Sequence, residues 1–400
     1  MRILCLTSRL PYPPHRGDRL RVFNFTRELA RTHELHLVSF IARQEELEHL
    51  PSLHDHFRQV ELVHQSPLRS ALAAAGNAWR RDPLQVGYYR SRAMQRLVND
   101  TLAAHNFDAV YVHLFRMTPY VARATHLYRI ADLTDVISAE VSRSLAYRSP
   151  FWRLVYGVEG PRISAYERRV ARTFEETWLV SEADRRILGA ACPQANIRVV
   201  PNGVDVERFR PMGKAPRPNS LIFVGHLRVF HNVDAATHLS EDVLPLIHRK
   251  VPDARLRLVG ADPGPAVQQL AALPGVEVAG FVPDLNAALN EAAVFVAPLR
   301  FAAGVQNKVL EAMAAGRPVV TSSVVSAGLG AEPGEHLLVA DDAAETAAHI
   351  VRLLGDERER VRLAVSGRGF VAANYRWDYV TERMAAIERE LSDGMSAKGA

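Results

Sequence analysis

Short apolar runs alternate with amphipathic segments along almost the whole chain of 400 residues. In the first half, "RILCLTS", "ELHLVSF" and "DAVYV" each have the character of a buried strand, and "RLRVFNFTRELART" has apolar residues at helical spacing. The second half restarts the rhythm at "SLIFVGHL" and continues with "ARLRLVG", "GVEVAG" and "AVFVAPL". This alternation is typical of parallel sheets with helices on both faces. Because 400 residues exceed what one core usually organises, we predict two doubly wound, Rossmann-like α/β domains facing each other across a cleft.

Clusters of Pro and Gly indicate where these domains begin and end. The segment "VVPNGVDVERFRPMGKAPRPNS" is rich in Pro, Gly and Asn and is predicted to connect the domains. We therefore predict an N-terminal domain over 1–198, a linker over 199–219 and a C-terminal domain over 220–375. The last segment, 376–400, is predicted to be a helix that returns to the N-terminal domain and has a disordered end.

The composition is that of an ordinary globular chain, with 48% apolar and 23% charged residues. The apolar run after Met1 is too short for a secretory signal, and longer runs are interrupted well short of a membrane span. Cys5 and Cys192 are the only cysteines, which excludes a disulfide framework or a cysteine-rich metal site. A cytoplasmic protein is expected.

The net charge of +5 favours anionic partners, but no Lys/Arg block with interleaved aromatic residues predicts nucleic-acid binding. The sequence contains no P-loop, no Gly-x-Gly-x-x-Gly and no His/Cys/Asp set with metal-ligand spacing. We therefore expect no metal and no bound cofactor.

The segment "GVQNKVLEAMAAGRPVV", residues 304 to 320, contains one of the chain's four lysines. A helix is predicted from near Gln306, with its apolar stripe on one face and Lys308 and Glu311 together on the other. The partial positive charge of a helix N-terminus, joined by the Lys308 ammonium, would suit a diphosphate, and Glu311 could accept hydrogen bonds from sugar hydroxyls. The alternative is an exposed Lys–Glu pair that contributes only a few tenths of a kcal/mol.

Three loops that follow predicted strands are expected to open into the same cleft. They are "SRLPYPPHRGDRLR" in the first half and "GHLRVFHN" and "RFAAGVQNK" in the second. Ligands of doubly wound sheets bind beyond the carboxyl ends of the strands, where such loops lead into helix N-termini.

The ordered set "PYPPHRGDRLR", "LVSEADRR", "VVPNGVD", "LIFVG", "NVDAATHL", "VAPLR" and "VLEAMAAGRPVV" resembles the retaining, GT-B-fold glycosyltransferases of family 4 over almost the whole chain. Among these it is most similar to the sugar transferases of exosortase-associated exopolysaccharide loci. The resemblance implies that Glu311 binds the ribose of a nucleotide-sugar donor, that Gly17 approaches the diphosphate and the reacting sugar, and that His113 faces the acceptor and the donor sugar.

The chain departs from the family pattern at several of these positions. The first carboxylate of the family's Glu-x7-Glu pattern falls on Ala303, the Arg and Lys that hold the diphosphate fall on His226 and His231, and a second loop glycine is Asp18. The leaving diphosphate must then be neutralised by other groups. Beside Glu311, the predicted donor-binding residues are Lys308, Asn307, Gln306, Gly304, Gly225, His226, Arg228 and Arg300.

The predicted catalytic residues are Lys308 together with four residues of the N-terminal half, Gly17, Asp18, His113 and Asp135. A neutral His113 could orient a hydroxyl or accept a proton, or it could be a satisfied histidine at a strand end. Asp135 is preferred to Asp132 because it lies farther past its strand, although both could simply form a turn. Asp18 could hold an acceptor hydroxyl or cap the following helix.

The segment "LRSALAAAGNAWRR" carries Leu68, Leu72 and Trp79 together with three arginines, Arg69, Arg80 and Arg81. Such a segment could lie on an anionic membrane surface and bring the enzyme to a lipid-linked acceptor. The alternative is a helix that packs on its own domain.

Taken together, the residues and the resemblance predict a cytoplasmic glycosyltransferase that moves a sugar from a nucleotide sugar to a saccharide or lipid-linked acceptor in exopolysaccharide assembly. One alternative is a nucleotide-sugar 2-epimerase on the same fold, which the absence of a carboxylate at Ala303 disfavours. The other is a catalytically weak subunit that binds a nucleotide sugar.

Overall fold

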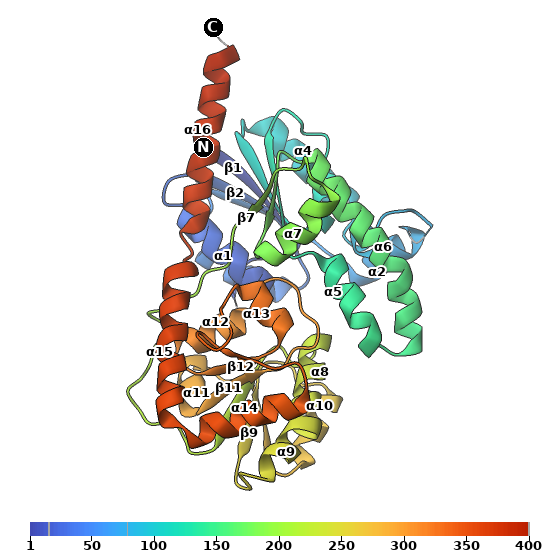
Figure 1. Ribbon diagram of the computed structural model, residues 1–400. Coiled ribbons are helices and arrows are strands. Elements are labelled where there is room, and N and C mark those ends of the chain that lie inside the picture. Colours follow the sequence, from blue (N-terminus) through green and yellow to red (C-terminus); the bar gives the residue numbers. More distant parts are fainter. Residues whose placement is uncertain (15–16, 78, 399–400) are drawn as a thin grey trace. The chain divides into compact units, whose positions relative to one another are not determined.

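Two parallel β-sheets organise the chain in the computed structural model, which describes residues 1–14, 17–77 and 79–398 (Figure 1). The first sheet belongs to a unit formed by Met1–Pro201 and the segment from Trp377 onward, here called the N-terminal unit. The second sheet belongs to Asn202–Arg376, the C-terminal unit. The α/β fold class predicted from the sequence is confirmed, with helices around each sheet (Figure 1).

The N-terminal sheet has seven strands in the order β3-β2-β1-β4-β5-β6-β7, all parallel. Its strands are β1 (Arg2–Thr7), β2 (Glu34–Ile41), β3 (Gln59–His64), β4 (Ala109–His113), β5 (Tyr128–Thr134), β6 (Glu176–Leu179) and β7 (Ile197–Val199). Its α-helices are α1 (Gly17–Leu29), α2 (Pro67–Asn77), α3 (Leu84–Tyr88), α4 (Arg92–Ala104), α5 (Ile137–Ser144), α6 (Pro150–Thr173), α7 (Glu182–Ala191) and α16 (Tyr379–Lys398). Shorter 3₁₀ segments are η1 (Gln44–Leu53), η2 (Phe115–Val121) and η3 (Leu145–Tyr147).

The C-terminal sheet has six parallel strands in the order β10-β9-β8-β11-β12-β13. They are β8 (Ser220–Val224), β9 (Arg255–Val259), β10 (Val276–Gly280), β11 (Val294–Ala297), β12 (Val319–Thr321) and β13 (Leu338–Val339). Its helices are α8 (Phe230–His238), α9 (Leu244–His248), α10 (Pro265–Gln269), α11 (Leu285–Glu291), α12 (Asn307–Ala314), α13 (Ser323–Leu329), α14 (Ala343–Gly355) and α15 (Glu357–Asn374), with the π turn η4 (Leu239–Val243) and the 3₁₀ turn η5 (Leu270–Ala272).

Prolines explain two interruptions of helical segments. The helical stretch from Ile137 to Thr173 is divided into α5, η3 and α6, and Pro150 stands at the first position of α6, where its missing N–H costs nothing. The helical stretch after β8 contains the π turn η4 between α8 and α9. Pro245 follows that turn, and a proline ring there is incompatible with regular α-helical hydrogen bonding to the preceding turn.

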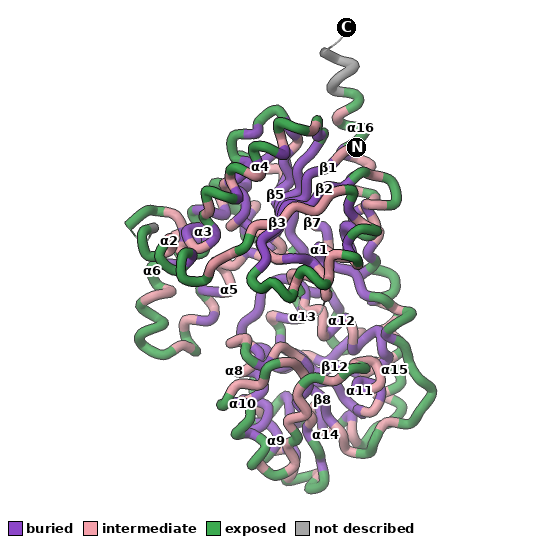
Figure 2. Tube along the Cα trace, turned by 180° about the vertical axis from the view of Figure 1, so that it is seen from behind, coloured by how far each residue is buried: buried purple, intermediate pink, exposed green. Residues whose placement is uncertain are grey.

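Apolar side chains from both faces of each sheet form the cores, so the central strands are buried (Figure 2). The outer strands β3, β7 and β10 are partly exposed, and most of the other exposed residues lie on the helices and loops. In the N-terminal unit, one core lies between the sheet and α1 together with α16, where the rings of Phe25 and Trp377 are 6.0 Å apart. The chain therefore returns after Arg376 to pack its last helix on the N-terminal unit. The disordered end predicted for the chain falls on residues 399 and 400, outside the described part.

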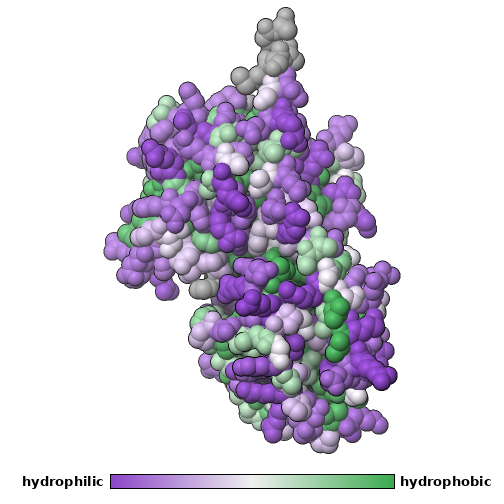
Figure 3. Space-filling view, turned by 90° about the vertical axis from the view of Figure 1, so that its left-hand side faces the viewer, coloured by the Kyte–Doolittle hydropathy of each residue, from purple (hydrophilic) through white to green (hydrophobic). Residues whose placement is uncertain are grey.

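The segment expected to be a linker packs closely on the C-terminal unit from Asn202 onward. The backbone N–H of Val204 donates to the carbonyl of Tyr375 at 2.9 Å, and that of Met212 donates to the side chain of Asn290 at 2.9 Å. Among the described residues, no helix combines the length and apolar character needed to cross a bilayer. Hydrophilic side chains cover most of the face shown in Figure 3.

Candidate active site

In each sheet, the strand order reverses between two neighbouring strands, and the predicted site residues follow those strands. In the N-terminal unit these strands are β1 and β4, and in the C-terminal unit they are β8 and β11. Connections from two such strands run to opposite faces of the sheet, which leaves a crevice at their carboxyl ends. Gly17 and His113 follow or end strands of the first pair, and Gly225 and Lys308 follow strands of the second.

Lys308 lies in the first turn of α12, whose N-cap is Gln306. Its ammonium donates a hydrogen bond to the Oδ1 atom of Asn232 and lies 5.1 Å from the centre of the Phe223 ring. Part of Lys308 remains accessible, but its ammonium is surrounded by protein, and this desolvation lowers the pKa of Lys308 to about 7 despite the opposing charge of Glu311. Within the described part of the chain, Lys308 forms no ion pair.

Asn232 fixes the position of the lysine. It is buried in the first turn of α8, and its Nδ2 atom donates to the carbonyl of His226 at 3.1 Å. The amide packs so closely on Gly225 that a Cβ atom there would lie 2.8 Å from Cγ of Asn232. Gly260 has a φ of +148°, and a Cβ atom on it would lie 1.6 Å from the carbonyl oxygen of Gly225. Glycine is therefore required at Gly225 to admit the Asn232 amide, and at Gly260 to admit the carbonyl of Gly225.

Glu311 lies one helical turn beyond Lys308. Burial raises the pKa of Glu311 to about 7, although Arg208 and Lys308 lower it. Its carboxylate makes no ion pair or hydrogen bond with the residues that the structure describes, Lys308 included. The paired Lys–Glu alternative considered from the sequence is therefore absent, and both charged groups keep capacity for a ligand.

The loop before α12 is held by its own polar groups. Gly304 has a left-handed φ of +58°, and a Cβ atom on Gly328 would lie 2.2 Å from its carbonyl oxygen. The side chain of Gln306 donates to the carbonyl of Ala303 at 2.9 Å, and that of Asn307 accepts from Asn202 at 2.9 Å. These contacts fix the entrance to α12.

The two predicted arginines of the donor site are each engaged with a carboxylate. Arg300 makes a two-pronged ion pair with Asp234 of α8, with distances of 2.9 Å from Nε and 2.5 Å from Nη2. Arg228 pairs with Asp262 at 2.8 Å, and both side chains are largely exposed. Each arginine would have to share its charge with an aspartate if a diphosphate bound. Lys308, whose hydrogen-bond partner is neutral, is the better placed cation.

His113 ends β4 and is buried, and its Nε2 atom lies 3.5 Å from the Oγ1 atom of Thr134. Burial lowers the pKa of His113 to about 4, because the loss of hydration outweighs the carboxylates of Asp132 and Asp18, which raise it. The imidazole is therefore neutral at pH 7 and can act as a hydrogen-bond donor or acceptor.

A buried polar cluster lies beside this histidine. Asp132 Oδ2 accepts hydrogen bonds from Nε of Arg21 at 2.6 Å and from the hydroxyl of Tyr111, and Asp132 Oδ1 accepts from the N–H of Thr134 at 3.1 Å. The side chains of Arg21, Tyr111 and Asp132 are essentially inaccessible to solvent. Burial and the Asp132 charge raise the pKa of Tyr111, so its hydroxyl stays protonated and donates. Asp132, which the sequence ranked below Asp135, thus anchors the turn that contacts His113.

The remaining predicted residues of the N-terminal unit lie near this cluster. Gly17 is the exposed first residue of α1, and the next residue, Asp18, accepts from Nη1 of Arg9 at 3.0 Å and from the N–H of Arg19 at 3.1 Å. Asp135 follows β5. Burial of its carboxyl group and the nearby charges of Asp184 and Glu140 raise the pKa of Asp135 well above its usual range.

Sequence reasoning missed Asn232, Phe223, Arg21 and Tyr111. The burial of Arg21 and its pairing with Asp132 are visible only in the folded unit, so the sequence carried no signal for Arg21. Asn232 and Phe223 left no signal either, since an asparagine in the first turn of a helix and a phenylalanine in a strand are ordinary.

Comparison with known proteins gives a consistent result. Residues 218–356 match the family model described as glycosyl transferases group 1. The chain is 28% identical over 280 residues to the MMP alpha-(1->4)-mannosyltransferase of Mycolicibacterium hassiacum, covering 67% of this chain and 64% of that one. It is 21% identical to an uncharacterized 44.6 kDa protein in the cps region of Klebsiella pneumoniae, covering 94% and 96%.

Solved structures share the fold of this chain. Sucrose-phosphate synthase from Thermosynechococcus elongatus superposes with a TM-score of 0.74 at 18% identity, covering 98% of this chain and all of that one. The chain is a glycosyltransferase with the GT-B fold. The matched family region contains every predicted donor-site residue, so Lys308 and Glu311 of this glycosyltransferase lie in its glycosyl transferases group 1 domain.

Proposed function

We propose that this glycosyltransferase moves a sugar from a nucleoside diphosphate sugar to a saccharide or lipid-linked acceptor, with retention of the donor's anomeric configuration. The observation that carries the proposal is the Lys308 ammonium, held in the first turn of α12 by a neutral amide and an aromatic ring. A leaving nucleoside diphosphate gains negative charge in the transition state, and a positioned cation beside helix N–H groups would stabilise it.

The other groups of both units have complementary roles in this proposal. Glu311 accepts hydrogen bonds from the ribose hydroxyls, because its carboxylate has no partner among the described residues. His113, neutral at pH 7, orients a hydroxyl of the reacting sugars, and Asp132 positions it through Thr134. Charge compensation by Lys308 also makes a resident metal unnecessary, so we expect transfer to persist in EDTA.

The proposed pathway is the assembly of a cell-surface polysaccharide, and the proposed place is the cytoplasm, where nucleotide sugars are made. The relative encoded in a cps region supports the pathway. Cell fractionation followed by immunoblotting tests the place.

Nucleotide binding is tested by thermal shift with UDP, GDP, dTDP and ADP. We expect one of them to raise the melting temperature of the wild-type protein, and Glu311→Ala to abolish the shift. Lys250→Met, a change at an exposed lysine of the same unit, is the control and should keep it. An undiminished shift in Glu311→Ala would refute the ribose role.

Transfer is tested with radiolabelled UDP-, GDP- and dTDP-sugars, with and without a lipid acceptor. Label that moves to the acceptor supports the proposal. Interconversion of free donor would indicate the epimerase, and binding without turnover would indicate the non-catalytic subunit. The non-catalytic alternative is favoured by one observation. Arg228 and Arg300 already pair with carboxylates, which leaves less of their charge for a leaving diphosphate.

Peripheral membrane contact is part of the proposal for a lipid-linked acceptor. Leu68 and Leu72 of α2 are exposed, Trp79 is 96% exposed, and Phe151 and Leu154 at the start of α6 are also exposed. The N–H of Leu84, the first residue of α3, donates to Glu159 of α6 at 2.8 Å, which joins α3 to α6. We expect the protein to sediment with anionic liposomes and to lose this binding when Arg69, Arg80 and Arg81 are replaced by Glu.

A further inference from the structure

A second site is suggested by a cavity of about 700 Å³ that lies wholly within the N-terminal unit. It is bounded by α3, by one face of α4 from Arg92 to Leu102 and by η2 with the loop that follows. Its cationic lining residues are Arg90, Arg92, Arg116 and Arg123, with His126 beside them. The volume is within the usual range for small-molecule sites.

None of the lining residues, all of which belong to the described part of the chain, carries a carboxylate. Arg90 reaches Asp82 at 3.4 Å, outside the lining, whereas Arg92 and Arg123 form no ion pair with any described residue. The four guanidinium groups around this cavity repel each other and create a positive electrostatic potential in it. Such an arrangement favours a ligand with several negative charges.

Contacts within the unit hold part of the cavity wall in place. Arg116 lies 4.8 Å over the ring of Tyr89 and donates from Nε to Ser8 at 3.1 Å and from Nη1 to Gln85 at 3.2 Å. The N–H of Ser91 donates to the hydroxyl of Tyr120 at 2.8 Å, which joins the start of α4 to η2. A guanidinium group held as Arg116 is held loses little entropy when an anion binds.

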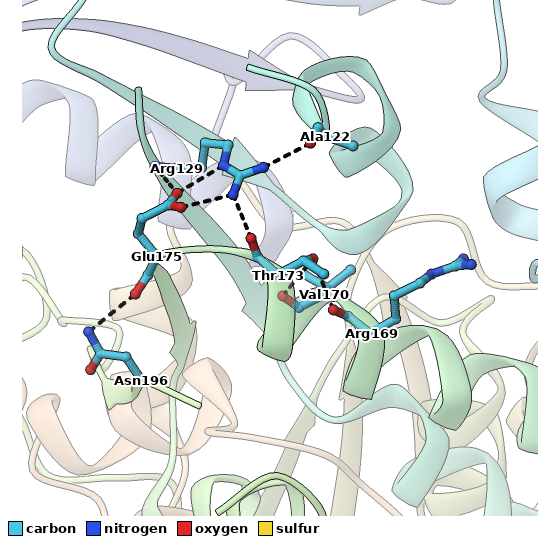
Figure 4. A network of polar contacts seen from close by, with 7 residues as sticks. All are labelled: Ala122, Arg129, Arg169, Val170, Thr173, Glu175 and Asn196. Carbon is cyan, nitrogen blue, oxygen red and sulfur yellow. Dashed lines mark hydrogen bonds and ion pairs between the residues drawn. The ribbon is translucent and has the colours of Figure 1, made fainter. Parts of the chain in front are cut away.

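A separate network of hydrogen bonds around Arg129 holds the loop after η2 (Figure 4). Arg129 donates to the carbonyl of Ala122, a lining residue, at 2.8 Å and to that of Thr173 at 2.5 Å, and it pairs with Glu175 at 2.8 Å. Figure 4 also shows Asn196 donating to the carbonyl of Glu175, at 3.2 Å. This network positions the loop that carries Arg123.

The N-terminus of α4, which lines the cavity, adds to the positive potential there. Ser91 is the N-cap of α4, and its hydroxyl accepts from the N–H of Met94 at 3.3 Å. The first turn of α4 contributes Arg92 to the lining, so the partial positive charge of the helix N-terminus acts in the same direction as the guanidinium groups.

We infer that this cavity binds a diphosphate group of the acceptor. A single carboxylate is matched by one arginine, whereas a diphosphate uses several guanidinium groups in two-pronged contacts. Apolar lining from Val86, Leu102 and Pro119 leaves room for a group attached to the diphosphate. Only the assignment to the acceptor rests on the proposed function, because diphosphate binding can be measured without any transfer.

The cavity also lies near the predicted catalytic histidine in the same unit. Arg116 follows His113 by three residues, and its charge is among those that lower the pKa of His113.

Calorimetric titration with inorganic pyrophosphate tests the site in a Lys308→Met background, which removes the lysine of the proposed donor site. We expect saturable binding there, and at least a tenfold loss of affinity when Arg92→Gln and Arg123→Gln are added. The matched control is Arg31→Gln with Arg186→Gln, two arginines of the same unit whose side chains are each 76% exposed. No binding, or an equal loss in the control, would overturn the inference.

Two further ligands identify the source of the diphosphate. Tighter binding of farnesyl diphosphate than of pyrophosphate would support a lipid-linked acceptor, and equal binding would support a soluble one. Binding of glucuronate in preference to pyrophosphate would overturn the diphosphate assignment. If transfer fails in all assays while pyrophosphate still binds, the proposed function fails and the cavity assignment stands.

Discussion

Buried charges are handled differently in the two units of this glycosyltransferase. In the N-terminal unit, Arg21 and Asp132 pair directly at 2.6 Å with both side chains inaccessible. In the C-terminal unit, Lys308 and Glu311 stand one turn apart on α12 without forming an ion pair, and desolvation moves the pKa of each to about 7. The first cluster is complete in itself, whereas the second is complete only when a ligand supplies the missing charge.

The largest effect that would test this contrast is the loss of one partner of the complete pair. Arg21→Met leaves Asp132 buried without its counterion and should lower the free energy of unfolding by about 3–5 kcal/mol. Denaturant unfolding followed by tryptophan fluorescence measures it, because all four tryptophans, Trp79, Trp152, Trp178 and Trp377, lie in the N-terminal unit.

The matched change in the other unit is Lys308→Met. Its stability cost should be about 1–3 kcal/mol, because the partner left behind is a neutral amide rather than a charge. A loss as large as that of Arg21→Met would erase the distinction between the two clusters.

For turnover we expect Lys308→Met to have a larger effect than Arg21→Met, the reverse of their order for stability. Lys308→Met removes the cation that we assign to the leaving diphosphate and should lower kcat by about 10²–10³-fold, the usual cost of one positioned donor. Steady-state transfer kinetics measure it, with Lys250→Met as the control. Wild-type rates in Lys308→Met would remove the lysine from the mechanism.

A change of pH should alter nucleotide affinity by less than Lys308→Met alters kcat. The pKa of Lys308 in the free protein is about 7, so above that pH a bound diphosphate must draw a proton onto the amine. Nucleotide affinity should therefore fall as pH rises, by about tenfold between pH 7.5 and 8.5, where the phosphate itself is already ionised. Calorimetry in buffers of different ionisation enthalpy would detect the accompanying proton uptake.

The same titration in Lys308→Met serves as the check. Its affinity should no longer fall over this range, because His113, with a pKa of about 4, is already neutral. The ionisation of Glu311, whose pKa is about 7, would act in the opposite direction, because its carboxylate accepts hydrogen bonds from the ribose hydroxyls. A fall that persists in the variant would assign the titration to another group.

The smallest effect belongs to an exposed pair. Arg228 and Asp262 are 65% and 50% exposed, so Arg228→Ala should change the free energy of unfolding by about 0–1 kcal/mol. A decrease in nucleotide affinity of more than tenfold would show that Arg228 leaves Asp262 to bind the diphosphate. Denaturation and nucleotide titration of the same variant distinguish these results.

The sequence by itself determined the α/β class, the alternation of strands and helices in both halves, and the helix that carries Lys308 and Glu311. These features depend on local periodicity, on Gly and Pro at the ends of elements, and on the order of short motifs, all of which can be read along the chain. The resemblance to glycosyltransferases rests on the same motifs.

Only the tertiary structure decided which charges are neutralised. That Arg300 meets Asp234, that Lys308 meets Asn232, and that Arg21 meets Asp132 depend on contacts across 66, 76 and 111 residues. Whether a charged group keeps capacity for a ligand depends on its burial and its partner, and neither has a signature in local sequence. The arginine-lined cavity is of the same kind, since its walls come from segments that meet only in the folded unit.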